Sequence, residues 1–138
     1  MGTRSTIAIR NTDNTVTGIY CHWDGYLEHN GKILAENYTT EAAVRELIAL
    51  GDLSSLGETV GVKVDFNGSH DGQCLAYGRD RGETGIEAGT YTDFADLQDK
   101  AAQEYTYVFD AADSTWSVAY GSGVQLKPLV EELAKEIA

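Results

Sequence analysis

The sequence predicts an α+β fold: a single antiparallel sheet built from hairpins, with helices packed mainly on one face. Segments with alternating apolar residues come in neighbouring pairs joined by turn residues, as in hairpins. Amphipathic segments with helical spacing lie between and after these pairs. Strands and helices do not alternate regularly, which disfavours a parallel sheet. The 138 residues contain no linker or repeat, so one globular domain over residues 1–138 is expected.

The N-terminal part is predicted to form a hairpin. Apolar and more polar residues alternate over 5–10, which is typical of a strand. Asn and Asp residues over 11–14 favour a turn, because their side chains hydrogen-bond the local backbone. The β-branched and aromatic run over 15–23 is expected to be the returning strand. A polar loop is expected over 24–31.

Two helices are expected next. Residues 32–38 have apolar residues on one face and predict a short helix. Thr40 is suited to cap a second helix that runs through Leu50, and Gly51 is suited to end it.

The middle of the chain has a weaker pattern. It predicts strands over 60–66 and 73–77, which a turn over 67–72 would join. A tight connection over 52–57 precedes them, and a glycine-containing loop over 78–85 follows them.

The C-terminal part predicts a helix, a hairpin and a helix. Thr92 is suited to cap a helix that runs through about Gln103. Residues 105–109 and 115–120 are expected to pair, because aromatic residues that alternate along both strands would meet across the sheet. The last amphipathic helix is expected to begin near Lys127.

The charge balance limits the classes of partner. The chain has 22 acidic and 10 basic residues and a formal net charge of -12. Such a surface repels phosphate backbones, so direct nucleic-acid binding is not expected. It attracts basic partners, including proteins that themselves bind nucleic acid, although net acidity can also serve solubility alone. No apolar stretch is long enough to span a bilayer, so no membrane partner is expected.

Acidic residues concentrate in one segment that comprises the third predicted helix and the second hairpin. If they meet in space, they form a negative patch that could occupy a partner's nucleic-acid groove. The alternative is an ordinary solvated face. The candidate partner-binding residues are Asp93, Asp96, Asp99, Glu104, Asp110 and Asp113.

Two other clusters suggest a small-molecule ligand. Residues 20–26 combine aromatic rings that can stack on a base with polar side chains, although alternate residues could simply be sheet core. Residues 77–85 place two arginines between glycines, and a guanidinium group suits phosphate. Asp80 and Glu83 could instead neutralise those arginines in internal ion pairs. The candidate ligand-binding residues are His22, Trp23, Asp24, Tyr26, Arg79 and Arg81.

Metal binding and catalysis are weakly indicated. The histidines have no metal-binding spacing, so neither a metal nor another cofactor is expected. Cys21 with His22, or Cys74 with His70, would make a nucleophile pair. Neighbouring strand residues point to opposite faces, which disfavours the first pair. No catalytic residue is assigned.

Several strings resemble a family of small phage and prophage accessory proteins. The resemblance spans most of the chain, and the family has no established activity or catalytic residues. It implies a phage protein that acts in the cytoplasm of a bacterial host. The strings are TRSTIAI (3–9), YCHWDGY (20–26), ENYTT (36–40), LGDLSSLG (50–57) and AYGRDRGET (76–84).

Three functions follow as hypotheses. The first is an inhibitor of a bacterial defence system, comparable to an anti-CRISPR protein, that binds a host effector protein through the acidic surface. The second is a sponge that sequesters a nucleotide second messenger. The third is a small enzyme of unknown class. The sequence leaves the oligomeric state open, and a homo-oligomer is compatible with each hypothesis.

Overall fold

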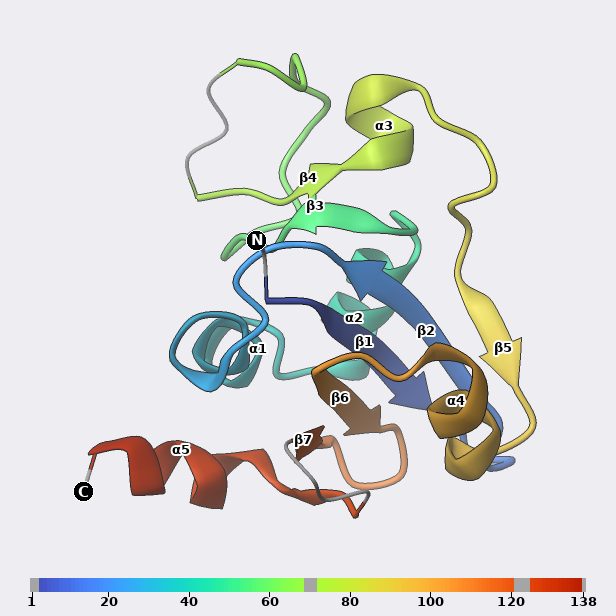
Figure 1. Ribbon diagram of the computed structural model, residues 1–138, viewed down its shortest axis with the longest axis vertical. Coiled ribbons are helices and arrows are strands. Elements are labelled where there is room, and N and C mark those ends of the chain that lie inside the picture. The colour runs from blue at the N-terminus through green and yellow to red at the C-terminus, as the bar shows by residue number, and fades with distance from the viewer. Residues whose placement is uncertain (1–2, 69–71, 121–124, 138) are drawn as a thin grey trace.

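The computed structural model describes residues 3–68, 72–120 and 125–137, and Figure 1 shows their arrangement. The described residues form one eight-stranded sheet in the order β4-β3-β2-β1-β6-β7-β8, with β5 pairing to β2. Its strands are β1 (Ser5–Arg10), β2 (Val16–Cys21), β3 (Leu53–Ser55), β4 (Leu75–Ala76), β5 (Gly89–Tyr91), β6 (Tyr105–Asp110), β7 (Thr115–Tyr120) and β8 (Lys127–Pro128).

The sheet is mixed, so the α+β class is confirmed but the purely antiparallel sheet is wrong. The hairpins β1–β2 and β6–β7 form as predicted, and Phe109 lies opposite Trp116 in the second. The two hairpins meet through β1 and β6, which run parallel. β3 is also parallel to β2. Helices α1 (Lys32–Asn37) and α2 (Glu41–Ile48) lie between these strands in the sequence and form the crossover connection that a parallel pair requires.

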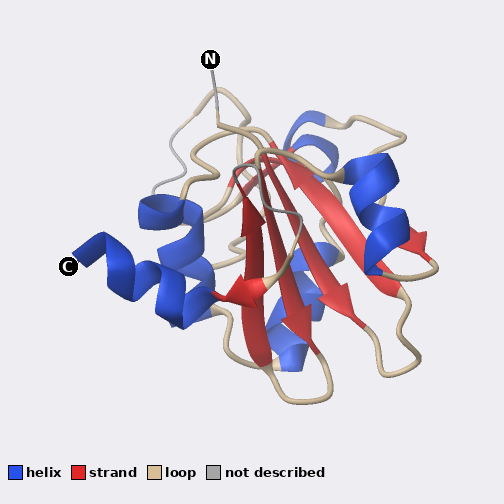
Figure 2. Cartoon of the chain, turned by 60° about the horizontal axis from the view of Figure 1, so that its bottom comes forward, coloured by secondary structure: helices blue, strands red, loops and turns tan. Residues whose placement is uncertain are grey.

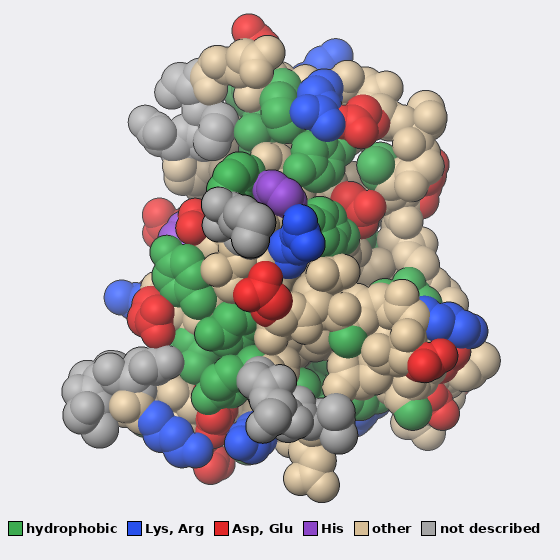
Figure 3. Space-filling model, viewed as in Figure 1, with side chains coloured by type: hydrophobic (Ala, Val, Ile, Leu, Met, Phe, Trp, Pro, Cys, Tyr) green, Lys and Arg blue, Asp and Glu red, His purple; other side chains and the backbone are tan. Residues whose placement is uncertain are grey.

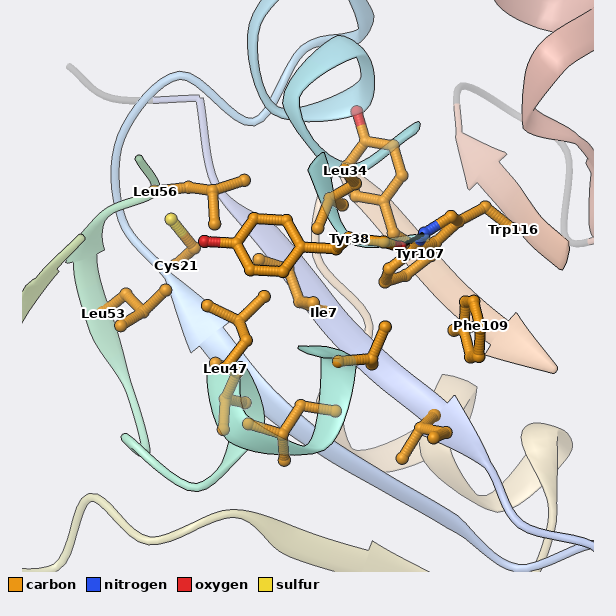
Figure 4. Close-up of a cluster of buried hydrophobic side chains, with 14 of the residues drawn as sticks. Ile7, Cys21, Leu34, Tyr38, Leu47, Leu53, Leu56, Tyr107, Phe109 and Trp116 are labelled. Atoms are coloured by element: carbon orange, nitrogen blue, oxygen red, sulfur yellow. Dashed lines mark hydrogen bonds between the residues drawn. The ribbon is translucent and has the colours of Figure 1, made fainter. Parts of the chain in front are cut away.

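Helices cover both faces of the sheet (Figure 2). Helices α1, α2 and α5 (Leu129–Ile137) contribute apolar side chains to the larger core. In Figure 4, Leu34 and Leu47 from α1 and α2 surround Ile7 and Tyr107 of the sheet. On the opposite face, α4 (Phe94–Ala101) buries Leu97 in a smaller core with Ala8, Val16 and Val108.

The helix caps follow local chemistry. The Thr40 side chain accepts a hydrogen bond from the Ala43 N–H at 3.2 Å, as predicted for an N-cap. The helix ends at Ile48, and Gly51 follows with φ of 76°. For α4, the predicted cap is wrong by one residue. Asp93, not Thr92, is the N-cap, and α4 ends at Ala101 instead of Gln103.

Several other predicted bounds are also wrong. Residues 60–66 are not a strand, because the Val64 N–H donates to the Asp80 carboxylate instead of to a neighbouring strand. The predicted loop over 78–85 contains helix α3 (Tyr77–Arg81), and the strand over 73–77 shrinks to β4. The connection over 52–57 contains β3, and part of the turn over 67–72 lies outside the described residues.

Two further segments differ from the expectation. The predicted loop over 24–31 contains a π-helical turn, η1 (Leu27–Gly31). The last helix begins at Leu129, because Lys127 and Pro128 form β8 instead. Within the described ranges, no helix is long and apolar enough to cross a membrane.

Candidate functional site

The aromatic cluster at the end of β2 divides into two parts. The Tyr20 hydroxyl lies 2.7 Å from His22 Nδ1, and the His22 ring meets the Trp23 ring edge-on, with centroids 4.7 Å apart. The Trp23 side chain is 43% exposed, so its ring is accessible to a partner. Asp24 and Tyr26 interact with each other instead, since the Asp24 carboxylate raises the pKa of Tyr26. Of the four ligand-binding residues predicted in this string, His22 contacts Trp23 and Asp24 interacts with Tyr26, so the structure forms two pairs instead of one cluster.

Arg79 is occupied by structural contacts. Its guanidinium pairs with the Asp80 carboxylate at 3.0 Å and donates to the carbonyl oxygens of Val60 and Cys74, each at 2.9 Å. Only 17% of the Arg79 side chain is exposed, so a ligand has little access to it. From the sequence, an internal ion pair with Asp80 was the alternative to ligand binding, and Arg79 forms that ion pair.

The Asp80 carboxylate organises the surrounding backbone. It accepts hydrogen bonds from the N–H groups of Ala76 at 2.8 Å and Val64 at 3.0 Å. Burial acts to raise the pKa of Asp80, but the Arg79 and backbone hydrogen bonds outweigh it and lower the pKa. Through its hydrogen bond with Val64, the charged Asp80 carboxylate links the irregular segment 60–66 to α3.

Arg81 faces solvent on an aromatic base. Its guanidinium carbon lies 4.5 Å from the centroid of the Phe66 ring and 4.7 Å from that of Tyr77, and these two rings stack on each other. Such cation–π contacts favour an arginine held flat against the rings. Glu83 pairs with Arg81, and 48% of the Arg81 side chain remains exposed. Phe66 was missed as a site residue, because it lies in an irregular segment far from Arg81 in sequence. Tyr77 lies inside the predicted string 77–85 but was not assigned as a ligand-binding residue.

The two clusters are joined through Asp52. The Tyr20 N–H donates to Asp52 Oδ1 at 2.9 Å, and the Tyr77 N–H donates to the Asp52 carbonyl oxygen at 3.3 Å. We call the resulting set the aromatic–arginine surface. Figure 3 shows that hydrophobic, basic, acidic and histidine side chains lie next to one another in the upper half of the face in view. The surface consists of Tyr20, His22, Trp23, Phe66, Tyr77 and Arg81.

A polar cavity adjoins this surface. It has a volume of about 270 Å³ and lies between β2, β5 and the end of α4. We call it the Asp52 pocket. Burial raises the pKa of Asp52 and the nearby Glu87 charge adds to the effect, while the Tyr20 N–H opposes it. No local motif predicted this pocket, because separate elements supply its lining. Its polar lining includes Tyr20, Asp52, Glu87, Tyr91, Lys100 and Gln103.

The acidic residues of α4 stabilise the helix itself. Asp93 accepts a hydrogen bond from the Asp96 N–H at 2.8 Å, and Asp96 in turn accepts from the Thr92 N–H at 3.0 Å. Asp96 also pairs with Lys100 at 2.7 Å. Asp99 is exposed. These contacts are those of a capped helix with an i,i+4 ion pair.

The remaining acidic candidates lie at opposite ends of β6. Glu104 precedes the strand and accepts from the Arg4 N–H at 3.4 Å. Asp110 ends the strand and pairs with Arg10 at 3.4 Å, while Asp113 accepts from the Thr115 hydroxyl in the following turn. A six-residue strand spans about 20 Å. The six predicted acidic residues therefore do not form one continuous patch.

The cysteines do not have the environment of nucleophiles. Both thiols are buried. Burial raises the pKa of Cys21 to about 12 and also raises that of Cys74, so both are protonated near neutral pH. His70, the partner considered for Cys74, lies outside the described residues. Across the described ranges, no group of three or more metal-binding side chains comes together.

Comparison with known proteins adds no relative from which a site could be transferred. No protein-family model, curated protein or solved structure matches the chain.

Proposed function

We propose that this protein binds and sequesters a small nucleotide-type ligand at the aromatic–arginine surface. The observation that carries the proposal is the half-exposed Arg81 guanidinium lying over the stacked rings of Phe66 and Tyr77. The exposed Trp23 ring belongs to the same surface. Stacking planes and a cationic donor group are thus available together.

Nucleotide chemistry matches these groups. A base that stacks on an aromatic side chain gains about 1–3 kcal/mol, whatever its identity. The planar guanidinium of Arg81 offers several N–H donors to a phosphate, and Glu83 is exposed enough to move aside. Burial raises the pKa of Tyr20 and the positive charge of Arg4 acts to lower it, so a second cation lies near the same surface.

The net charge favours a short ligand over a polymer. The formal charge of -12 repels a long phosphate backbone at most of the surface. A mononucleotide or cyclic dinucleotide places only one or two phosphates near Arg81 and Arg4. A local cationic group can bind such a ligand despite the acidic surroundings.

Binding of the ligand can be measured by calorimetry. We would titrate the protein with ribonucleoside 5′-monophosphates, cyclic dinucleotides and ADP-ribose. An R81A variant is expected to bind at least about tenfold more weakly, because a charge-assisted hydrogen bond is worth about 1.5–3 kcal/mol. Arg45→Ala is the matched control, since Arg45 is equally exposed and also pairs with a glutamate. Absence of binding by every probe, or unchanged affinity in R81A, would reject the proposal.

A second candidate is the defence inhibitor that binds a host effector protein. It is supported by the net charge of -12 and by two exposed carboxylates, that of the α4 N-cap Asp93 and that of Asp99 on α4. With the phage resemblance, this role would be carried out in the cytoplasm of a bacterial host. Its test is co-purification with host nucleases at low and high salt. Retention that Asp99→Lys leaves unchanged would argue against this role of α4.

A further inference from the structure

The Asp52 pocket opens beside the aromatic–arginine surface. Tyr20 belongs both to the pocket lining and to the aromatic–arginine surface, and the Asp52 carbonyl oxygen accepts the Tyr77 N–H. A ligand that stacks on the aromatic rings can therefore extend into the pocket.

The pocket has room for part of a ligand. Its volume of about 270 Å³ is just below the roughly 300 Å³ at which pockets for whole drug-sized molecules begin. A sugar ring fits such a space, while a base and its phosphates would need the neighbouring surface.

The polar groups in the pocket require hydrogen-bond donors from the ligand. One oxygen of Asp52 accepts the Tyr20 N–H, and an ionised carboxylate has further lone pairs. Glu87 is exposed and lines the same pocket, so the pocket offers two carboxylate acceptors. Two carboxylates repel phosphate, which leaves the phosphate to Arg81 and Arg4.

The other lining side chains are also hydrogen-bonding groups. Lys100 lines the pocket but pairs with Asp96 at 2.7 Å, so it does not occupy the Asp52 and Glu87 carboxylates. The Tyr91 hydroxyl also lies at the pocket, because a side chain on Gly89 would come within 2.9 Å of it. Carboxylates, a tyrosine hydroxyl and an amide from Gln103 are groups that bind hydroxyls.

We propose that the Asp52 pocket binds the ribose of the nucleotide, with Asp52 and Glu87 accepting hydrogen bonds from its vicinal 2′- and 3′-hydroxyls. An acidic side chain that accepts from a ribose hydroxyl is an established arrangement in dinucleotide-binding folds. The inference rests on the proposed nucleotide binding and adds a selectivity: the protein distinguishes ribonucleotides from deoxyribonucleotides.

The test compares the four ribonucleoside 5′-monophosphates with their 2′-deoxy counterparts by calorimetry on the full chain. We expect the best ribonucleotide to bind about ten- to a hundredfold more tightly than its 2′-deoxy form, the ratio that a hydrogen bond to a charged group provides. In E87Q and D52N this ratio is expected to fall to within about threefold. Glu46→Gln, an exposed glutamate on α2, is the control and retains the ratio.

The outcomes separate the two proposals. Equal binding of ribo- and deoxyribonucleotides by the wild type, with loss of binding in R81A, overturns the ribose assignment alone. No binding of any of the eight compounds, of the cyclic dinucleotides or of ADP-ribose overturns both. E87Q keeps the test decisive if D52N does not fold, because Glu87 is exposed and its replacement is tolerated at the surface.

Discussion

At the scale of single residues, two arginines in one short string have different roles. Arg79 and Arg81 flank Asp80, and the sequence alone treats them as one cationic cluster. Helix α3 separates them, because residues two apart on a helix point about 200° away from each other. Arg79 therefore points to the buried Asp80 contacts, while Arg81 lies on the exposed rings. Only the helix, which was predicted as a loop, distinguishes the two.

Alanine substitutions should separate these roles. Arg79→Ala leaves the Asp80 carboxylate buried without its cation, and the expected cost is about 3–5 kcal/mol of unfolding free energy. Arg81→Ala removes an exposed cation–π contact and should cost no more than about 1 kcal/mol. Urea denaturation of both variants measures the difference. Equal losses of stability would contradict the assignment of Arg79 to the structure and Arg81 to the surface.

At the scale of elements, the fold was predictable where interactions are local. The hairpin β6–β7 could be predicted because aromatic residues alternate along both strands, and Tyr105 stacks on Tyr120 with centroids 5.3 Å apart. The N-cap at Thr40 was predictable because its partner, the Ala43 N–H, is three residues away. The parallel pairing of β1 with β6 was not predictable, because nothing local says which edges of two hairpins meet.

The alternation over residues 60–66 shows a second limit. Val62 fits a strand pattern, yet 69% of its side chain is exposed. The segment is held by backbone contacts instead, since the Val64 N–H and the Val60 carbonyl bind the Asp80 and Arg79 side chains. A hydrophobic pattern reports burial, and it cannot reveal a segment held by distant polar groups.

Helix α5 is attached to the sheet by a buried carboxylate. The side chain of Glu132 is 4% exposed, accepts from the Tyr120 hydroxyl at 2.6 Å and pairs with Lys135 at 2.9 Å. The Tyr120 and Lys135 hydrogen bonds lower the pKa of Glu132 from its usual value of 4.5. The folded state therefore favours the charged carboxylate.

Replacement of Glu132 should loosen α5. In Glu132→Gln, we expect several-fold faster amide hydrogen exchange in α5, because the charge-assisted bonds are lost. Glu131→Gln is the matched control, since Glu131 is exposed on the same helix. The wild-type contact should be complete above the usual pKa of 4.5 and lost as the pH falls through the lowered folded value. This role would be contradicted if the α5 amides exchanged at the same rate in Glu132→Gln as in the wild type. It would also be contradicted if the protection of these amides in the wild type, relative to an unfolded chain at the same pH, did not change with pH.

At the scale of the whole molecule, the candidate site depends on residues that only folding brings together. His22, Trp23 and Arg81 were identifiable because each lies in a short polar and aromatic string. Phe66 and Asp52 were not, because they join the site from an irregular segment and a connection between elements. Sequence patterns thus identify the parts of a site within one segment, while the completing residues require the tertiary fold.

The two buried thiols should report the stability of the whole molecule. Cys21 and Cys74 belong to the core beneath the sheet and are protonated near neutral pH, so a thiol reagent reaches them only after the structure opens.

We expect the labelling rate of each thiol to fall as the denaturant concentration is lowered. The rates of Cys21 and Cys74 should depend on denaturant concentration in the same way. A ligand that binds only the folded state should slow labelling further. At one hundred times its Kd it stabilises the protein by about 2.7 kcal/mol, which is about a hundredfold in rate when opening is at equilibrium. Mass spectrometry of timed aliquots measures both rates, with Arg81→Ala as the control for ligand protection. Rapid labelling of either cysteine without denaturant would contradict a single cooperative core, because that thiol would then be reached by local opening.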